Sequence, residues 1–261
     1  MPTPIDLLLD PISLGVFGLY AAMMLWEWLL PAKPMPQIRG WRVRAFAAFG
    51  VYFFLSSYVP YLWDPFLARY QIFDLTSLGT IPGALVGLLV FNALLYAWHR
   101  SLHASPLLWR VFHQMHHSAE RIETAGAFYF SPLDMVGFTF LGSLALTLVV
   151  GLSPQAVTLF LFVGMFLAIF QHANVRTPQW LGYFVQRPES HALHHQRGVH
   201  RYNYSDLPLY DMLFGTFRNP PTNHVTTGFF DGASARVVDM LLMKDISTSR
   251  QPETSAKAAR S

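Results

Sequence analysis

Residues 81–103 read IPGALVGLLVFNALLYAWHRSLH, an apolar run over 81–98 that leads directly into two histidines, His99 and His103. A helix needs about 20 apolar residues to cross the hydrocarbon of a bilayer, or slightly fewer in a short hairpin. Residues four apart lie on one face of a helix. The stretch therefore predicts a membrane-spanning helix that presents two histidines on one face at one membrane surface.

Four further apolar runs lie outside this stretch, at about 11–31, 45–63, 135–151 and 154–171. The first contains Glu27, and Gly151-Leu-Ser-Pro154 predicts a tight turn between the last two, which are short. Hydrophobic residues make up 52% of the chain and charged residues only 13%, whereas soluble domains are about a quarter charged. We therefore expect an all-α integral membrane bundle of four to five spans, with a cytoplasmic, histidine-rich helical cap.

Lysine and arginine are distributed unevenly over the loops between these runs. The loop after the first run carries Lys33, Arg39, Arg42 and Arg44, whereas the loop after the second carries only Arg69. With the N-terminus outside, 17 of the 18 Lys and Arg residues lie on the cytoplasmic side, as the positive-inside bias requires. We therefore predict an outside N-terminus and a bacterial inner-membrane location, with the histidines and the C-terminus in the cytoplasm.

The two ends of the chain carry weaker signals. The start, Met-Pro-Thr-Pro-Ile-Asp, has no basic residue before the first apolar run, so we expect that run to stay as an anchor rather than to be cleaved as a signal peptide. Residues 231–244 are expected to form an amphipathic helix on the membrane surface, and 246–261 a disordered tail. The isoelectric point of about 9.2 comes from loop residues rather than a basic stripe, so no nucleic-acid partner is indicated.

Ten of the eleven histidines lie between positions 99 and 200. Nine of them form recurring short patterns, in which spacings of three and four can aim two or three rings at a common point on a helix. The patterns are His99-Arg-Ser-Leu-His103, His113-Gln-Met-His116-His117, Gln171-His172-Ala-Asn174 and His191-Ala-Leu-His194-His195. Such clustering has no simple structural cause, since protonated imidazoles repel one another. His224 is interpreted as a surface residue.

Imidazole is a neutral ligand suited to iron, zinc, copper and nickel. Nine candidates exceed the four to six ligands that one metal takes, so the number favours two metals. The chain has no cysteine, which excludes disulfides, iron–sulfur clusters and thiolate-bound zinc. Structural zinc sites are closed at four ligands, and the Glu-x-x-His pattern of carboxylate-bridged di-iron bundles is absent. A histidine-dominated pair of redox irons beside a lipid-facing cavity fits better.

Over roughly 90–217 the sequence resembles the fatty acid hydroxylase/sterol desaturase superfamily of membrane-bound di-iron oxygenases. The resemblance rests on the order of the histidine boxes and on the trailing Asn203-Tyr-Ser-Asp-Leu-Pro-Leu-Tyr-Asp-Met-Leu-Phe-Gly-Thr-Phe217. It implies that two irons use O2 to hydroxylate or desaturate an unactivated C–H bond of a lipid, and that zinc can replace iron in a recombinant sample. The implied metal ligands are His99, His103, His113, His116, His117, His172, His191, His194 and His195.

The resemblance leaves a tenth ligand open, for which His200, Asn174 or water are candidates. Metal-bound histidines donate their second ring N–H to a carboxylate or carbonyl. Among the nearby carboxylates Glu120, Asp134, Glu189, Asp206 and Asp211, we favour Asp211; the alternative is a helix cap or an ion pair with Arg197, Arg201 or Arg218. The domain division that follows is a membrane anchor over 1–80, the di-metal catalytic domain over 81–217, an interfacial segment over 218–245 and a tail over 246–261.

A lipid hydroxylase is the favoured function, and a desaturase with the same site is the nearest alternative. The chain contains no Gly-x-Gly-x-x-Gly motif and no recognisable cytochrome or flavin domain, so electrons from NAD(P)H would arrive through a separate redox protein. A metal transporter would place ligands midway along the spans, and a haem carrier needs fewer histidines. A scaffold without chemistry is the least favoured. The substrate stays open among fatty acyl, sterol, sphingoid, hopanoid and carotenoid-like lipids.

Overall fold

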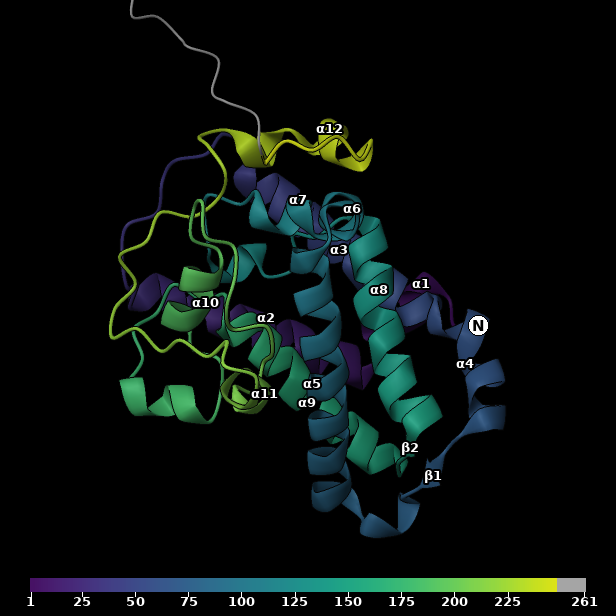
Figure 1. Cartoon of the computed structure of the whole chain (residues 1–261). Coiled ribbons are helices and arrows are strands. Elements are labelled where there is room, and N and C mark those ends of the chain that lie inside the picture. Colours follow the sequence, from purple (N-terminus) through teal and green to yellow (C-terminus); the bar gives the residue numbers. More distant parts are fainter. Residues whose placement is uncertain (248–261) are drawn as a thin grey trace, which may run out of the picture.

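The structure is a computed structural model that describes residues 1–247 and is built almost entirely of helices (Figure 1). The long helices are α2 (Pro11–Leu29), α3 (Trp41–Tyr58), α5 (Thr80–Ala104), α8 (Pro132–Ser143) and α9 (Pro154–Phe170). The short helices are α1 (Pro4–Leu9), α4 (Pro60–Leu67), α6 (Pro106–Leu108), α7 (Gln114–His117), α10 (Pro188–His194), α11 (Leu209–Leu213) and α12 (Val237–Leu241).

Shorter turns and one strand pair connect these helices. The 3-10 turns are η1 (Ala68–Tyr70), η2 (Thr76–Leu78), η4 (Thr124–Gly126), η6 (Gln179–Tyr183) and η7 (Ala233–Ala235), and the π-helical turns are η3 (Trp109–His113) and η5 (Leu144–Val149). The strands β1 (Phe73–Asp74) and β2 (Val150–Gly151) pair in parallel, with Phe73 opposite Val150. The pair joins the α4–α5 connection to the predicted turn at 151–154, which the structure confirms.

Four helical segments of the described chain are long and apolar enough to cross a membrane: Pro11–Leu29, Trp41–Tyr70, Thr80–Ala104 and Pro132–Val149. Pro154–Phe170 is a fifth, shorter apolar helix. The predicted all-α membrane bundle is thus confirmed, with shifted edges. The second span runs over Trp41–Tyr70 rather than 45–63, and the third continues to Ala104 and includes both His99 and His103. Only 17% of the apolar window of the first two spans is buried inside the protein, so their apolar faces point outward, as lipid contact requires.

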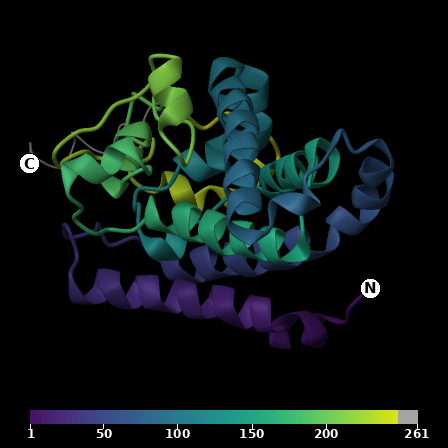
Figure 2. The same ribbon diagram turned by 90° about the horizontal axis from the view of Figure 1, so that it is seen from below.

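The long helices form a bundle in which α9 contacts both α2 and α5, and α8 contacts both α3 and α5 (Figure 2). Glu27, the acidic residue of the first span, has a structural role in this bundle. Its Oε2 accepts hydrogen bonds from the backbone N–H of Thr124 (2.7 Å) and of Asn174 (2.9 Å). The carboxylate therefore ties α2 to the turn η4 and to the segment that follows His172.

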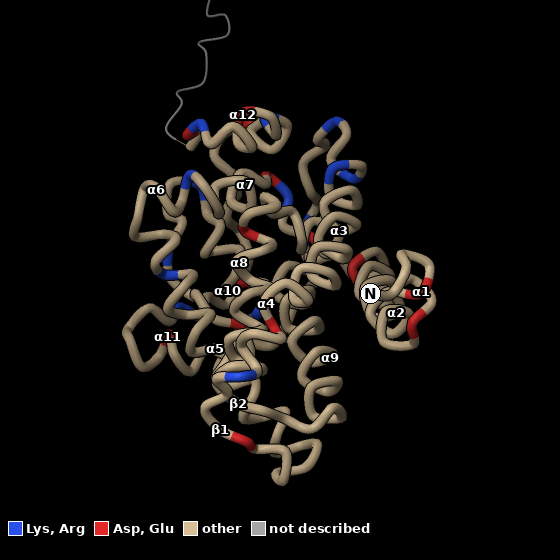
Figure 3. The backbone as a smooth tube through the Cα atoms, turned by 90° about the vertical axis from the view of Figure 1, so that its right-hand side faces the viewer, with Lys and Arg blue, Asp and Glu red and all other residues tan. Residues whose placement is uncertain are grey.

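Lys and Arg gather at one end of the bundle, around α6, α12 and the start of α3, while the opposite end near β1 and β2 carries few (Figure 3). The histidines at the C-terminal end of α5 lie toward the basic end. The charge asymmetry read from the sequence is therefore a feature of the folded chain.

The C-terminal segment differs from its prediction. Residues 231–244 do not form one amphipathic helix; they contain the turn η7 and the five-residue helix α12. Arg236, whose ψ of 41° is not helical, separates η7 from α12, and the left-handed residues Gly232 and Met243 (φ 90° and 57°) bound the segment. Of the tail predicted over 246–261, residues 248–261 lie outside the described part of the chain.

Two glycines allow α5 to approach α9 closely, and this contact places the histidine-bearing end of α5. A Cβ added at Gly83 would lie 2.9 Å from the Cβ of Ala156, which cannot rotate away. One at Gly87 would lie 2.9 Å from Leu152, just before α9, and 3.4 Å from Phe160 of α9. Small residues four apart permit such close helix packing in membranes. The spacing of these glycines therefore fixes how α5 sits in the bundle.

We expect Gly83→Ala to lower the stability of the bundle by about 1–3 kcal/mol, because overpacking a tight contact forces the backbones apart. Gly18→Ala is the matched control, since an added Cβ there meets nothing within 4 Å. In a helix interior Ala is otherwise better than Gly by roughly 0.5–1 kcal/mol, so the control should be neutral or stabilising. Thermal unfolding in detergent measures both, and an equal response of the two variants would contradict this packing.

Candidate metal centre

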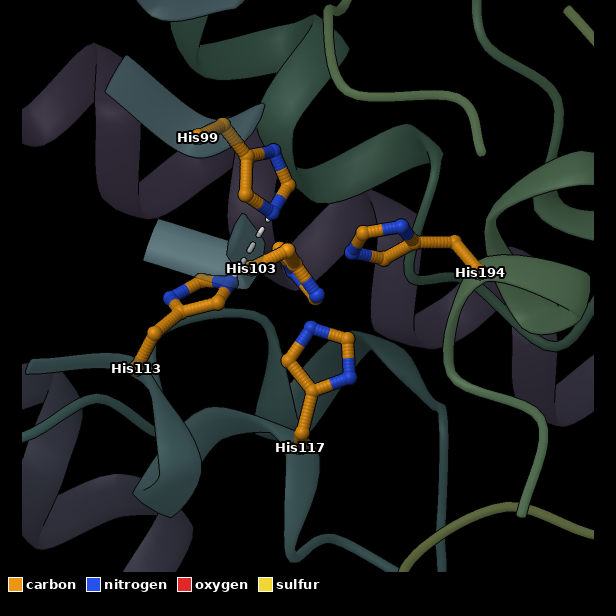
Figure 4. A group of neighbouring side chains, drawn as sticks. All are labelled: His99, His103, His113, His117 and His194. Carbon is orange, nitrogen blue, oxygen red and sulfur yellow. Dashed lines mark hydrogen bonds between the residues drawn. The ribbon is translucent and has the colours of Figure 1, made fainter. Parts of the chain in front are cut away.

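The nine boxed histidines come together in two adjacent groups among residues 1–247. In each group one ring nitrogen per residue lies within 4.8 Å of all the others. Group A consists of His99, His103, His113, His117 and His194 (Figure 4). Group B consists of His116, His172, His191 and His195. The structure therefore brings every predicted ligand to one place, while binding of a metal there stays a prediction.

Each HxxHH box is divided between the two groups, and the two boxes are divided in opposite ways. From the first box, His113 and His117 join group A and His116 joins group B. From the second box, His191 and His195 join group B and His194 joins group A. The spacing predicted two or three rings of a box at a common point, and two meet there: residues i and i+4 share a centre, and residue i+3 serves the other.

Local structure sets the direction of these rings. The π-helical turn η3 ends at His113, immediately before α7 carries His116 and His117, and π-helical turns often occur at functional sites. Helix α10 starts with Pro188 in its first turn, where a missing N–H costs nothing. Glu189 anchors that turn by accepting a hydrogen bond from the backbone N–H of Thr177 (2.8 Å).

The second ring nitrogen, Nδ1, is fixed by a hydrogen bond in most of group A. His99 donates to the carbonyl of Tyr204 (2.8 Å), His103 to that of His200 (2.7 Å) and His194 to that of Tyr202 (2.7 Å). His113 donates to the carboxylate of Asp134 (2.7 Å). In group B, His172 donates to the carbonyl of Ala168 (2.7 Å). These acceptors place the proton of a neutral ring on Nδ1 and leave Nε2 as a bare lone pair.

The Nε2 atoms of several rings lie close together, and this arrangement tests whether the site fits a metal. In group A the Nε2 atoms of His99 and His113 are 2.9 Å apart. In group B the Nε2 of His172 lies 3.2 Å from that of His116 and 2.9 Å from that of His191. The buried Nε2 atoms of His103, His117 and His194 have no hydrogen-bond partner in the described chain. Facing lone pairs repel unless a cation lies between them, so the donor set fits two metal ions.

Burial keeps these rings neutral. Loss of hydration lowers the pKa of His113, His116, His117, His191, His194 and His195 well below the ordinary histidine value, and the neighbouring rings lower it further. Burial lowers the pKa of His172 to about 4. A neutral imidazole is the form that binds a metal, so near pH 7 no proton has to leave before a metal enters.

The loop 200–204 supplies three of the carbonyls of group A and is strained. His200, Tyr202 and Asn203 have positive φ values of 42°, 74° and 51°. Outside glycine, a left-handed residue costs roughly 1–2 kcal/mol, with asparagine among the best tolerated. The surrounding structure must compensate for this cost, and such strained residues concentrate at functional sites.

The residues considered as a tenth ligand or as a partner of a ring, His200, Asn174 and Asp211, make other contacts. The Nδ1 of His200 is 3.0 Å from the Nδ1 of His117, on the side away from the metal-facing Nε2. Asn174 uses its side chain to bond the backbone of Lys33 (2.7 Å to its carbonyl). Asp211, the favoured partner of a ring, instead accepts from the backbone N–H of Tyr204 (2.8 Å). The carboxylate that contacts a ring is Asp134. His224 is exposed, as predicted.

A cavity of about 570 Å³ extends from both histidine groups into the helical bundle. His99 and His113 of group A line its wall, as do His116, His172 and His191 of group B. Most of the remaining wall is apolar and comes from the spanning helices α2, α3, α5, α8 and α9, with Phe49, Phe53, Phe91, Phe138, Phe160 and Met165 among its residues. The size is that of ordinary small-molecule sites, roughly 300–1,000 Å³.

Two residues of this wall, Phe130 and Asp206, were not predicted to line a cavity, although Asp206 was a candidate partner of a ring. Phe130 stacks on His116 with ring centroids 4.1 Å apart. Asp206 is buried and accepts a hydrogen bond from the amide of Gln171 (2.7 Å); burial raises the pKa of its carboxyl to about 6. Phe130 lies in the run of aromatics after the second box, and Asp206 in the motif after the fourth. From the sequence alone, neither position shows whether its side chain lines a cavity or packs in the core.

Comparison with known proteins agrees with this site. The fatty acid hydroxylase family model matches residues 84–216, just over half of the 261-residue chain. A very-long-chain aldehyde decarbonylase of Oryza sativa subsp. indica is 29% identical over 140 residues, which cover 51% of this chain and 53% of the relative. The ornithine lipid hydroxylase of Rhizobium tropici is 33% identical over 144 residues, covering 52% and 42%.

The sphingolipid C4-hydroxylase of Schizosaccharomyces pombe is 28% identical over 129 residues, covering 48% of this chain and 44% of the relative. The chain thus spans about half the length of the curated relatives it matches. No solved structure shows a significant match. The matched region 84–216 contains all nine histidines of groups A and B. The chain therefore belongs to the fatty acid hydroxylase family.

Proposed function

We propose that the chain is a membrane-bound di-iron oxygenase that hydroxylates an unactivated C–H bond of a lipid, with O2 as co-substrate. The observation that carries this proposal is the meeting of two groups of inward-facing Nε2 lone pairs at the head of an apolar cavity. Either feature alone would suit several kinds of membrane protein. Together they suit a reaction in which an apolar substrate must reach a redox metal pair.

The chain's own residues bind and shield the substrate. The apolar wall formed by the spanning helices would hold a lipid chain and keep water away from it. Because rings of both groups line the same cavity, a carbon held there would lie next to both metals. Phe130, which stacks on His116 and also lines the cavity, would help to orient the chain.

The nine histidines of groups A and B would hold the two irons, which when bound supply the activation of dioxygen. The carbonyls of residues 200, 202 and 204 and the carboxylate of Asp134 hold the ring protons of four group A histidines on Nδ1, so that the Nε2 atoms of these four rings face inward. Such outer partners fix ring orientation and raise ligand basicity. Zinc would fit the same donors, so a recombinant sample can contain it in place of iron.

The names of the relatives support a lipid as substrate, since they include hydroxylases of an ornithine lipid and of a sphingolipid. We propose a lipid with a long apolar chain and electrons delivered from NAD(P)H by a separate redox protein, with the histidines on the cytoplasmic side. A desaturase would use the same site. Mass analysis of the product separates the two, since a hydroxylase adds one oxygen atom and a desaturase removes two hydrogen atoms.

Protein grown with iron and purified in detergent should contain about two irons per chain, one for each group. His194→Ala removes a ligand of group A and His116→Ala one of group B, so each should lower the content toward one, and the double variant toward zero. His224→Ala is the control, because that exposed residue belongs to neither group. Elemental analysis gives the counts, and a folded wild-type protein without transition metal would refute the proposal.

A side chain that fills the cavity should block the substrate without disturbing the metals. Gly164 lines the cavity, and a Cβ added there meets nothing within 4 Å, so Gly164→Leu should fold and keep its metal. We expect the yield of oxygenated long-chain lipid in expressing cells to fall at least tenfold, since one methylene of clash in a filled pocket costs about 1–3 kcal/mol.

Gly50→Leu is the matched control, because Gly50 also has open space around an added Cβ but does not line the cavity. Mass spectrometry of extracted lipids measures the yield in both variants. Equal yields from Gly164→Leu and Gly50→Leu would show that the substrate does not use this cavity.

A further inference from the structure

Among the described residues, the hydrogen bonds from the loop 200–204 to the boxed histidine rings all go to group A. The loop carbonyls at His200, Tyr202 and Tyr204 accept from His103, His194 and His99, and the ring of His200 contacts that of His117 at 3.0 Å. Four of the five rings of group A are thus oriented by five consecutive residues. Within the described chain the loop makes no hydrogen bond to the rings of group B, where His172 uses the carbonyl of Ala168 instead.

The side chain of Asn203 holds this loop in place. Its amide nitrogen donates to the carbonyls of Ser190 (3.0 Å) and Arg218 (2.9 Å), and its oxygen accepts from the N–H of Arg218 (2.8 Å). Asn203 is fully buried, and its own carbonyl accepts from the side chain of Gln186 (2.7 Å). These bonds connect the loop to the segment that follows α11 and to α10, which carries His194 of group A and also His191 of group B. The ring contacts of the loop itself, however, are with group A.

The same residue stabilises a backbone conformation that the chain would otherwise avoid. Asn203 has a φ of 51° and follows Tyr202, whose φ is 74°. Asparagine tolerates this left-handed region better than most residues with a side chain. Without the three side-chain bonds, the loop can relax toward ordinary φ values, and its carbonyls would then turn away from the rings of group A.

We propose that Asn203 is a positioning residue that selectively fixes the metal of group A, through the loop 200–204, and leaves the metal of group B unaffected. The inference rests on the proposed two-metal function. Asn203 does not touch the metal; it acts on three ring orientations at once. Loss of the hydrogen-bond partners behind metal-bound histidines weakens metal affinity on the order of 10–100-fold. In an Asn203 variant, the weaker affinity should be confined to group A.

The test combines Asn203→Ala with ligand variants that disable one group at a time. In the wild-type background, Asn203→Ala should lower the iron content from two toward one after exposure to a chelator. In the His116→Ala background, where only group A is intact, it should remove the remaining iron. In the His194→Ala background, where only group B is intact, it should change nothing. Iron per chain is measured by elemental analysis of the full-length protein in detergent.

Asn92→Ala is the matched control. Asn92 is also a fully buried asparagine and also bonds the backbone near this loop, accepting from the N–H of Leu207 (2.9 Å). Its side chain makes no hydrogen bond to residues 200–204 of the described chain, so its variant should keep both irons. If Asn203→Ala does not fold, Asn203→Gly decides, because glycine adopts the left-handed conformation freely while the side-chain bonds are still lost.

Two outcomes in a folded Asn203 variant would overturn the inference. One is equal loss of iron from both groups, and the other is retention of both irons at the chelator concentration used for the wild-type protein. Absence of iron from the wild-type protein would instead count against the proposed function. The two failures are therefore distinguishable in a single series of samples.

Discussion

The site depends on one electrostatic constraint: many imidazole rings share a small, dry space with their lone pairs directed at one another. Burial makes protonation unfavourable, and acceptors behind five of the nine rings hold the remaining proton on the far nitrogen. Without those acceptors the rings could rotate so that an N–H met a lone pair, and the chamber would collapse into an ordinary hydrogen-bond network. Much of the surrounding structure, from Asp134 on α8 to the strained loop 200–204, serves to prevent that rotation.

The membrane helices contribute position rather than chemistry. Close packing of α5 on α9 at Gly83 and Gly87 sets the height of His99 and His103, and the Glu27 carboxylate connects α2 to the segment beside His172. Burying a carboxylate inside an apolar run is costly unless it accepts hydrogen bonds. Here the donors are backbone N–H groups that would otherwise lack acceptors. The cap and the spans are therefore one structural unit at the site.

The sequence predicted the helical class, the span positions, the turn at 151–154 and the set of histidines that meet, because apolar length and box spacing are local signals. It did not predict how each HxxHH box divides between two groups, since that depends on how α7 and α10 face each other. It favoured Asp211 over Asp134, because nearness along the chain does not reveal which carboxylate lies behind a ring. The single helix expected over 231–244 was wrong, because amphipathic composition does not reveal the backbone break at Arg236 between η7 and α12.

The wall of the cavity combines residues inside and outside the region that matches the family. The histidines and the helices α5, α8 and α9 fall inside the region shared with the family, whereas Phe49, Tyr52 and Phe53 of α3 and the residues contributed by α2 precede it. Substitutions in these first helices can reshape the chamber while no ligand moves. Under the proposed function, part of the control over substrate choice would therefore lie outside the stretch that carries the histidines, although Phe91, Phe138 and Phe160 of the cavity wall lie inside it. A lineage could then alter which lipid it accepts by changing the first two spans, without replacing any histidine.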